Sequence, residues 1–359
     1  MRVLFVYGFC GLGGVETSIL NKLAALETVG VEGRAWFAAL YGSGGSTLAG
    51  HPRVRVGGDV RPWAEGSDAL CVVDYPPFLE ALGDRVSTPV VWESHDSSRA
   101  TFGARYVQAL HHPNVAAIVV PSRFNYERVR PLTTRAVEVI PNAIDDRVFY
   151  CRPRRSVPGP GPGTMEGPLL LWVGRLEDEK NPLEFARIGE RVLGERSDAQ
   201  CLVVGDAASD AEYAAYRDRL LGAIEARWRP RVRLARSLPY PDMPGLYSWT
   251  ARVGGCLVST SLAESSPMTF LEAMACRCPV VSTNVGGVGE LVAEGVTGRL
   301  YASGDLEDGV RAVLETIEPA RGWDRHERTR RALAAVGERH ALTAVGARYK
   351  SLLERVVGA

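Results

Sequence analysis

Short apolar runs alternate with amphipathic stretches along the first part of the chain. Residues 3–6 form an apolar run, a glycine-rich loop follows at 8–14, and 15–26 carries apolar side chains at helical spacing. Further apolar runs predict strands at 35–40, 69–73, 90–92, 116–120 and 137–140. Because strands that alternate with helices form parallel sheets covered on both faces, we expect an α/β domain here.

The same alternation restarts after a segment that favours neither helix nor strand. Residues 152–168 are rich in proline and glycine, which places a domain boundary in this segment. Beyond it, strands are expected at 169–173, 201–204, 232–235, 255–259 and 279–283, and helices at 182–193, 212–227, 242–249, 267–276 and from about 324 onward. Two similar parallel-sheet halves are expected to bind ligands at the carboxyl ends of their strands, in a cleft between them.

Composition narrows the class of protein. The chain has 359 residues, of which 46% are hydrophobic and 23% charged, and its formal net charge is zero, so nucleic acid is not an expected partner. The sequence contains no apolar run of the ~18 residues that span a bilayer, and its start does not resemble a signal peptide. Seven scattered cysteines suit reduced core thiols, so we expect a cytoplasmic protein. Only three lysines occur (22, 180 and 350), which makes each of them conspicuous.

Two glutamates eight positions apart form the strongest candidate site. Glu264 is expected to end a strand, Pro267 suits the first turn of the following helix, and Glu272 lies further into that helix. The amides of Met268 and Thr269 would then face an anion at a helix N-terminus. Acids beside a phosphate site make sense if they accept hydrogen bonds from the hydroxyls of a sugar and of a ribose.

Arg175 and Lys180 form the second candidate. Arg175 follows an expected strand end and Lys180 precedes the next helix, so both are expected at the ligand-binding edge of the sheet. A guanidinium and an ammonium together can hold a diphosphate. The acids at 177–179 are interleaved with these cations, so we expect neither a metal site nor a cofactor here.

The first domain adds a glycine loop and a histidine. The glycines let a backbone approach a phosphate or a sugar closely, but they also match a dinucleotide-binding fingerprint. That interpretation needs an acid at the end of the second strand, which instead ends Leu40-Tyr41, so an NAD-dependent Rossmann enzyme is kept only as an alternative. His95 follows a strand end and could donate to a sugar hydroxyl or assist proton transfer.

Together these candidates resemble the retaining GT-B glycosyltransferases that carry an E-x7-E motif. Glu264 and Glu272 have the spacing of that motif, and residues 120–124, 139–145, 203–206 and 278–290 agree further. The resemblance covers nearly the whole chain and is most specific over 256–300. It implies an α/β fold of GT-B type, with two Rossmann-like parallel-sheet domains facing across a cleft. The acceptor domain would span 1–155 and the donor domain 156–341, and a helix at 342–359 would cross back to the first domain.

The resemblance also implies roles for single residues. Arg175 and Lys180 would hold the diphosphate and stabilise it as it leaves, Glu264 would contact the transferred sugar, and Glu272 would bind the ribose hydroxyls. The reaction would retain the anomeric configuration without a metal. The implied catalytic residues are His95, Arg175, Lys180 and Glu264. The implied donor-binding residues are Gly13, Gly14, Glu16, Arg175, Lys180, Arg236, Ser237, Leu238, Glu264, Ser266, Pro267, Met268, Thr269 and Glu272.

The acceptor is left open by the sequence. This family often has Gly-Phe-Gly after the first glutamate, where this chain has Ser265 to Met268, so the donor sugar is also open; a UDP-sugar is favoured over a GDP-sugar. The acceptor would be a small molecule, a natural product, a glycan or a lipid-linked sugar, read by the loops at 41–50 and 94–104. The arginines at 123, 128, 130 and 135 suit either peripheral contact with the inner membrane face or a solvated helix face.

Other functions fit less well. A pyridoxal-phosphate sugar phosphorylase needs a Schiff-base lysine, and Lys22 and Lys350 lie in helices at the wrong places. A nucleotide-sugar-modifying Rossmann enzyme and a non-catalytic sugar-nucleotide-binding protein stay as alternatives.

Overall fold

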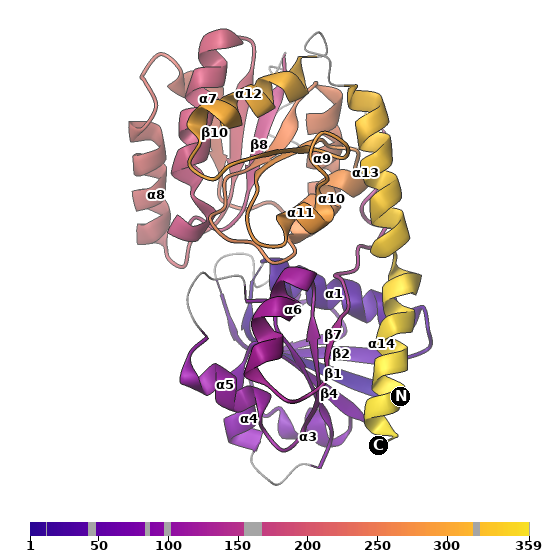
Figure 1. Cartoon of the computed structure of the whole chain (residues 1–359). Helices are drawn as coiled ribbons and strands as arrows, with labels where there is room; N and C mark the ends of the chain where they lie inside the picture. The colour runs from indigo at the N-terminus through magenta and orange to yellow at the C-terminus, as the bar shows by residue number, and fades with distance from the viewer. Residues whose placement is uncertain are drawn as a thin grey trace. The chain divides into compact units, whose positions relative to one another are not determined.

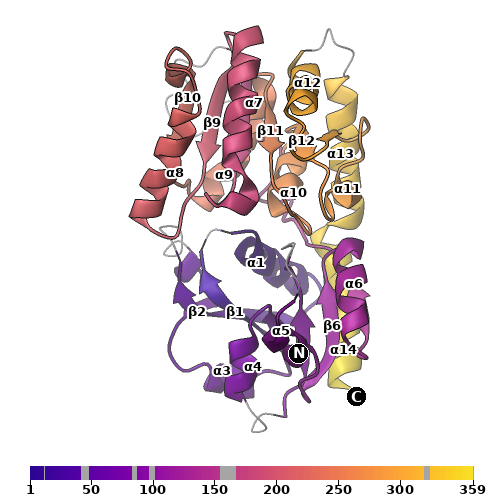
Figure 2. The ribbon, with the colours of Figure 1, turned by 60° about the vertical axis from the view of Figure 1, so that its left-hand side comes forward.

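The computed structural model describes residues 1–11, 13–41, 48–82, 87–96, 102–153, 167–318 and 324–358. Within them the chain forms two compact units, each built on one parallel sheet (Figure 1, Figure 2). The first unit combines Met1–Asp145 with Glu338–Ala359, and the second unit is Asp146–Gly337.

Within the described residues, seven parallel strands form the sheet of the first unit, in the order β3-β2-β1-β4-β5-β6-β7. The central strands are apolar along nearly their whole length because helices cover both faces of a parallel sheet. The strands are β1 (Arg2–Cys10), β2 (Glu32–Leu40), β3 (Val54–Val56), β4 (Ala69–Val73), β5 (Val90–Glu93), β6 (Val115–Val120) and β7 (Val137–Val139).

Helices cover the two faces of this sheet with separate hydrophobic clusters. Successive residues of β1 point to opposite faces, so Phe5 packs with Tyr349 in one cluster and Leu4 packs with Trp92 in the other. The helices are α1 (Gly14–Glu27), α3 (Arg61–Glu65), α4 (Pro76–Leu82), α5 (Ala104–Leu110), α6 (Arg123–Val129), the 3-10 turn η2 (Arg130–Leu132) and α14 (Leu342–Val357).

The last helix, α14, packs against α1 in the first unit (Figure 1). Gly346 makes this contact close, because a Cβ atom at that position would lie 2.3 Å from the backbone oxygen of Ala25. Just before the helix, Ala341 forms a parallel bridge with Ile144, and His340 Nδ1 lies 2.7 Å from the Asn142 carbonyl oxygen. The end of the chain therefore returns to the first unit.

The second unit repeats this architecture. Its described residues form a six-stranded parallel sheet in the order β10-β9-β8-β11-β12-β13. The strands are β8 (Leu169–Val173), β9 (Gln200–Val204), β10 (Val232–Ala235), β11 (Cys256–Ser259), β12 (Val280–Thr283) and β13 (Arg299–Tyr301). The helices and 3-10 turns are η5 (Asp178–Lys180), α7 (Pro182–Glu195), α8 (Asp210–Gly222), η6 (Arg229–Arg231), η7 (Tyr240–Asp242), α9 (Met243–Arg252), α10 (Met268–Ala275), α11 (Val288–Leu291), α12 (Leu306–Ile317) and α13 (Arg325–Arg339).

Strand order reverses once in each sheet. In the first unit the reversal lies between β1 and β4, and in the second between β8 and β11. Loops that follow such a pair of strands run in opposite directions and leave room for a ligand at the carboxyl edge. The loop with Arg175 follows β8, and the loop with Glu264 follows β11. Both candidates therefore lie in loops at the strand-order reversal of the second sheet.

The predicted fold class is confirmed, and most predicted elements are present with shifts of a few residues. Among the elements absent from the prediction are β3, β13, α11 and α12. The two strands have only three residues each and lie at sheet edges, too short for a periodic pattern. The helix expected at 212–227 ends at Gly222. The long helix expected from 324 is interrupted between α13 and α14, where Ala341 forms a bridge with Ile144 of the first unit.

The structural units divide before the predicted linker. Residues 146–153 belong to the second unit, where the Arg152 amide donates to Ser248 Oγ at 2.9 Å and the Phe149 ring lies 5.3 Å from the Tyr240 ring. Most of the predicted linker, 154–166, lies outside the described residues, as do 42–47 and 97–101 of the predicted acceptor loops. In the part of the chain that the structure describes, no helix is both long and apolar enough to cross a membrane.

Candidate functional site

A buried ion pair joins the two strand-end loops of the second unit. Lys180 ends the 3-10 turn η5, and its Nζ atom lies 2.7 Å from Glu264 Oε1. Their side chains are 20% and 11% exposed, so the pair is shielded but still reached by solvent. Asn181 follows in a left-handed conformation (φ 47°) and turns the chain into α7. The loop thus holds an ammonium beside a carboxylate at the carboxyl edge of the sheet.

The Glu264 side chain and backbone are fixed by further hydrogen bonds. Ser261 Oγ donates to Glu264 Oε1 at 2.7 Å, and the Gly287 amide donates to the Glu264 carbonyl at 2.9 Å. Glu264 does not end its strand as predicted, because β11 stops at Ser259 and the chain continues as a loop. The hydrogen bonds of this loop, including that from Thr283 Oγ1 to the Ser261 carbonyl, take the place of strand pairing.

Arg175 lies near this pair in the chain but is more exposed. Its side chain is 53% exposed, and Nη2 lies 3.1 Å from Glu177 Oε1. An exposed ion pair of this kind contributes little to stability.

Helix α10 follows the Glu264 loop and begins at Met268. Pro267 is the residue before the helix (φ −66°, ψ 123°), not part of its first turn as predicted. Met268 and Thr269 occupy the first turn, where backbone amides have no acceptor within the helix and the helix dipole favours an anion. Ser265 and Ser266 complete the buried connection between Glu264 and the helix.

Glu272 lies on the buried side of α10. Its carboxyl is 4% exposed, and Tyr247 on α9 donates its hydroxyl to Glu272 Oε2 at 3.0 Å. Burial raises the pKa of Glu272 to about 7, although the hydrogen bond from Tyr247 acts in the opposite direction. The carboxyl thus changes charge near neutral pH and gains from additional hydrogen-bond donors when it is ionised. Tyr247 carried no motif in the sequence and was not predicted.

The Arg236 side chain is held by acids and a ring of the second unit. Its Nε atom lies 2.8 Å from Asp206 Oδ1, Nη1 bonds to Asp210, and the guanidinium covers the Tyr213 ring. These contacts anchor the loop that follows β10, which includes Ser237 and Leu238.

In the first unit the glycine loop folds around Glu16. Gly13 caps the start of α1, and a Cβ atom on it would lie 2.6 Å from Glu16 Oε2. The Gly11 amide donates to Glu16 Oε1 at 3.0 Å, so the carboxylate organises the loop from within. A Cβ atom on Gly14 would meet nothing within 4 Å, which leaves that position open to a ligand.

His95 lies two residues beyond β5 and contacts a buried ion pair that was not predicted. Its Nε2 atom lies 3.1 Å from both Lys22 Nζ and Glu93 Oε2, and these two residues bond to each other. The Lys22 and Glu93 side chains are 1% and 0% exposed. The His95 amide also donates to Asp74 Oδ2 at 2.7 Å. The rarity of lysine was a signal for Lys22, but 71 positions separate it from its partner.

Asp74 lies in an unusual environment at the end of β4. It adopts a left-handed backbone conformation (φ 40°), which costs free energy for a residue other than glycine. Burial raises the pKa of its carboxyl to about 8, and the nearby carboxylates of Asp96 and Glu93 add to this while the His95 amide acts against it. A left-handed backbone and a raised carboxyl pKa thus occur together at this strand end, beside His95.

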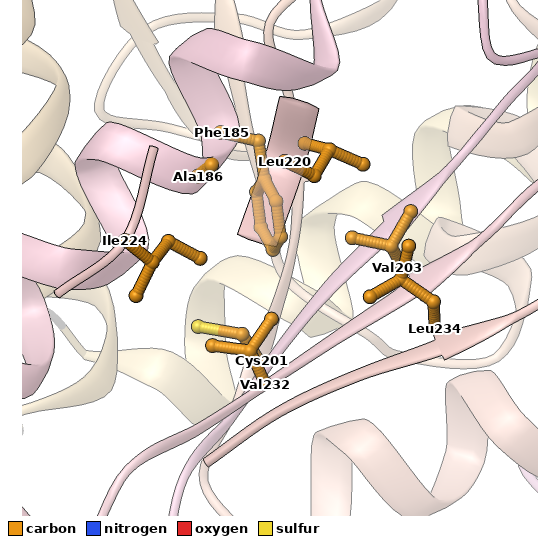
Figure 3. Close-up of a pocket in the computed structure, with 8 residues that line it drawn as sticks. All are labelled: Phe185, Ala186, Cys201, Val203, Leu220, Ile224, Val232 and Leu234. Carbon is orange, nitrogen blue, oxygen red and sulfur yellow. The ribbon is translucent and has the colours of Figure 1, made fainter. Parts of the chain in front are cut away.

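Figure 3 shows a cavity that does not belong to this site. It lies between α7, α8, β9 and β10 within the hydrophobic core of the second unit, and its lining includes Phe185, Cys201 and Leu234. The lining side chains carry carbon and one sulfur atom but no nitrogen or oxygen. A sugar nucleotide, with its many hydroxyls and phosphates, does not fit such a lining.

No cluster of three or more His, Cys, Asp or Glu side chains is placed to hold a metal ion among the described residues. Within each unit the structure brings together one group of predicted residues. In the second unit these are Lys180 and Glu264, followed by the start of α10. In the first they are the glycine loop and Glu16.

Comparison with known proteins also points to the second unit. Residues 167–318 match the family model for glycosyl transferases group 1. The chain is 24% identical over 246 residues to a lipopolysaccharide 1,2-N-acetylglucosaminetransferase of Salmonella typhimurium, covering 67% of this chain and 62% of that protein. It is 29% identical over 206 residues to a 2-deoxystreptamine N-acetyl-D-glucosaminyltransferase of Streptomyces fradiae, covering 56% of this chain and 46% of that protein. The chain thus spans less than two thirds of the length of these relatives.

Solved structures match over the whole chain. Anabaena HepE in complex with UDP-glucose has a TM-score of 0.78 at 20% identity and covers 99% of this chain and 100% of its own. Sucrose-phosphate synthase from Thermosynechococcus elongatus has a TM-score of 0.78 at 16% identity, with 100% of both chains covered. At these identities the likeness shows the fold, which is that of the GT-B glycosyltransferases. In its second unit, residues 167–318 are similar to the group 1 glycosyl transferases, whose family model they match.

Proposed function

We propose that this protein transfers a sugar from a nucleotide-diphosphate donor to an acceptor hydroxyl, with retention of the anomeric configuration. The observation that carries the proposal is the Lys180–Glu264 pair at the strand-order reversal of the second sheet, directly before the first turn of α10. A UDP-sugar is the favoured donor. The family match of the second unit and the UDP-glucose bound by Anabaena HepE support this choice.

The cations would act on the departing diphosphate. As the bond between the anomeric carbon and the phosphate oxygen breaks, negative charge grows on that oxygen, and Lys180 and Arg175 stabilise it. The acceptor oxygen bonds to the anomeric carbon from the same face, and its proton passes to the departing phosphate oxygen. No metal is required, because the two cations and the amides of Met268 and Thr269 supply positive charge. Unchanged turnover in excess EDTA would support this part, and its loss would contradict it.

The two glutamates would bind the hydroxyls of the donor. Glu264 pairs with the ammonium of Lys180 and would also accept a hydrogen bond from the transferred sugar. Glu272 would accept hydrogen bonds from the ribose, whose hydroxyls add to the donation from Tyr247. Gly13, Gly14 and the loop at 236–238 would line the diphosphate and the base, and His95 would contact the donor sugar.

The acceptor is proposed only as a class. The relatives that match act, by name, on lipopolysaccharide and on 2-deoxystreptamine, so the acceptor is a glycan, a lipid-linked sugar or a small natural product. Peripheral membrane contact through the α6 region has weak support. Arg123 pairs with Glu127, Arg128 donates to the Asp96 carbonyl, and Arg130 donates to the Thr133 carbonyl.

A donor screen tests the proposal directly. UDP- and GDP-sugars are added to the purified protein, and the unfolding temperature is recorded for each. A stabilising donor is then incubated with candidate acceptors, and the anomeric configuration of the product is read by NMR. Glu272→Ala should weaken binding of that donor by about 1–3 kcal/mol, since it removes the acceptor for buried hydroxyls. Stabilisation without turnover on any acceptor would favour a sugar-nucleotide-binding protein, and inversion of configuration would contradict the retaining mechanism.

A further inference from the structure

Lys22 and Glu93 form a buried ion pair that the roles above leave unexplained. Lys22 comes from the middle of α1 and Glu93 from the last position of β5, and neither side chain exceeds 1% exposure. Removing two charges from water is costly, and apolar side chains of similar volume would stabilise a core at least as well. A charged pair at this place therefore points to a role other than packing.

A third element completes the coordination of this pair. The Tyr349 hydroxyl on α14 donates to Glu93 Oε1, while Lys22 donates to Glu93 Oε2. Both carboxylate oxygens thus accept a hydrogen bond, one from each of two different helices. The lysine and the tyrosine also touch each other, with Nζ 5.6 Å from the ring centre. The carboxylate is held in one position by groups that are themselves packed in the core.

One ring atom of His95 contacts both members of this ion pair. His95 Nε2 lies 3.1 Å from Lys22 Nζ and 3.1 Å from Glu93 Oε2. On the backbone side, the His95 amide donates to Asp74 Oδ2. The imidazole is therefore held both through its ring and through its backbone, and its Nε2 atom is turned to the ion pair.

The charges around the ring decide its protonation. Lys22 on α1 and Glu93 on β5 cancel each other, so a proton on His95 would add a net positive charge to a buried site beside an ammonium. Burial and the Lys22 ammonium lower the pKa of His95, and Glu93 opposes them. The other titratable groups around this network are Cys71 of β4, Asp74 directly after β4, Asp96 of the loop after β5 and Tyr349 of α14. Burial raises the pKa of Cys71, Asp74 and Tyr349, which favours their neutral forms.

We propose that Lys22 and Glu93 are positioning residues that hold the His95 imidazole neutral and in one orientation. His95 then meets the donor sugar as a hydrogen-bonding group and not as a source of protons. This inference rests on the proposed function only for the identity of the ligand that His95 meets. The protonation of the ring is a property of the first unit alone.

Histidine NMR tests the protonation directly. Protein labelled at histidine is titrated without any donor, and the signal of His95 is identified by its absence in His95→Gln. In the wild type, the ring should stay neutral below pH ~6.5, where exposed histidines become protonated. In Lys22→Met, the buried carboxylate loses its cation, so His95 should take a proton at a higher pH than the exposed histidines. In Glu93→Gln the ammonium remains and the carboxylate is gone, so the midpoint should not rise.

Lys350→Met is the matched control. Lys350 lies on α14 and donates to the Val29 carbonyl at 3.2 Å, so the same substitution there removes a lysine without touching the His95 network. Its His95 titration should equal that of the wild type. If Lys22→Met does not fold, the double variant Lys22→Met with Glu93→Gln removes both charges together, and its His95 should stay neutral as in the wild type.

Turnover gives a second and separate readout. Relative to the wild type at the same pH, Lys22→Met should show an additional loss of kcat/KM at acidic pH, about tenfold for each pH unit below its new His95 midpoint, with recovery at alkaline pH. The double variant should lack this additional loss. A His95 midpoint that is the same in Lys22→Met and wild type, or a wild-type ring that titrates with the exposed histidines, would overturn the inference. Because the titration needs no donor, it can fail while glycosyl transfer stands, and absent transfer would leave its result intact.

Discussion

At the residue scale, the site depends on charges placed where water is scarce. Lys180 and Glu264 neutralise each other before a donor arrives, and Glu272 is kept partly protonated by burial. A bound nucleotide sugar would change both the ion pair and the protonation of Glu272, because its phosphates compete for the ammonium and its hydroxyls donate to the acids. The next three predictions use single substitutions to follow these changes.

Lys180→Ala should reduce kcat by about 100- to 1000-fold, because it removes a cation from the oxygen that gains charge as the donor bond breaks. The measurement is steady-state turnover with a saturating donor. Lys350→Ala, which removes a lysine that donates to the Val29 backbone carbonyl, serves as the control and should keep wild-type turnover. Equal turnover of wild type and Lys180→Ala would show that this ammonium does not stabilise the leaving group.

Binding of UDP should strengthen as the pH rises from 6 to 8. The pKa of Glu272 is raised to about 7 by burial, and the ionised carboxylate accepts ribose hydroxyls better than the protonated acid does. Affinity should therefore approach a tenfold gain per pH unit below that value, with proton release on binding, as measured by calorimetry in buffers of different ionisation heat. Glu272→Gln has no proton to lose, so its affinity should follow only the titration of the phosphate itself. Parallel curves for the two proteins would contradict the assignment.

Asp74→Asn should stabilise the protein at pH 8 relative to the wild type and have little effect at pH 4. The folded-state pKa of Asp74 is raised to about 8, so the folded state holds a proton that the unfolded state has already lost above pH ~4. The stability that this proton provides is complete below the unfolded pKa and is lost as the pH rises through 8. Asparagine avoids that loss and tolerates the left-handed backbone, so a gain on the order of 1–3 kcal/mol is expected at pH 8. Thermal unfolding at both pH values measures it, and a pH-independent difference would be the contrary result.

Several candidate site residues could be predicted from the sequence, but the residues that contact them could not. Arg175, Lys180, Glu264 and Glu272 are recognisable because loop and helix positions with fixed spacing carry them. Lys22 and Glu93 lie in different elements, and only the fold brings an α1 lysine under the end of β5. Local patterns cannot identify such a pair, because each member looks like a solvated charge until the tertiary structure removes the solvent.

At the element scale, helix α14 links the two ends of the chain within the first unit. It packs on α1, and its Tyr349 reaches Glu93. Sequence periodicity predicts strands and helices with long apolar patterns, as for β4, β8 and β10, whose bounds were predicted without error. It does not predict the break between α13 and α14, because this break comes from the pairing of Ala341 with Ile144 almost 200 positions away along the chain. Nor does it predict the three-residue edge strands β3 and β13.

Gly346→Ala should destabilise the first unit. A Cβ atom would lie 2.3 Å from the Ala25 oxygen, and backbone on both sides leaves no flexible side chain to move away, so α14 must shift from α1 at a cost of about 1–3 kcal/mol. Chemical denaturation followed by circular dichroism measures the loss. Gly337→Ala on α13 is the control: nothing lies within 4 Å of its Cβ position, and alanine there should be neutral or stabilising by up to ~1 kcal/mol. Equal effects of the two substitutions would show that the close helix contact does not exist.

At the scale of the whole molecule, the two units have parallel sheets of similar topology but carry different candidate residues. The second unit carries the family match and most of the candidate donor-binding residues, whereas the first unit carries the His95 network and the glycine loop with Gly13, Gly14 and Glu16. Each unit has its own hydrophobic core, so each is expected to open with its own free energy. This separation allows a ligand to be located by the unit that it protects.

UDP without a sugar should slow hydrogen exchange mainly in the second unit. Peptides that contain Lys180, the Glu264 loop and the start of α10 should gain protection, because the nucleotide binds the folded unit and not its opened forms. At a concentration of 100 times the Kd, the added stability is about 2.7 kcal/mol, which slows exchange through global opening of that unit about a hundredfold. Peptides from the core of the first unit, such as β4 and β6, should exchange at their original rates. Glu272→Ala, measured at the same UDP concentration, should lose most of the protection, and the Gly346→Ala variant should keep it while its first unit exchanges faster. If UDP instead protected the first unit alone, the donor site would lie there, and the assignment of Lys180, Glu264 and Glu272 to the donor would be wrong.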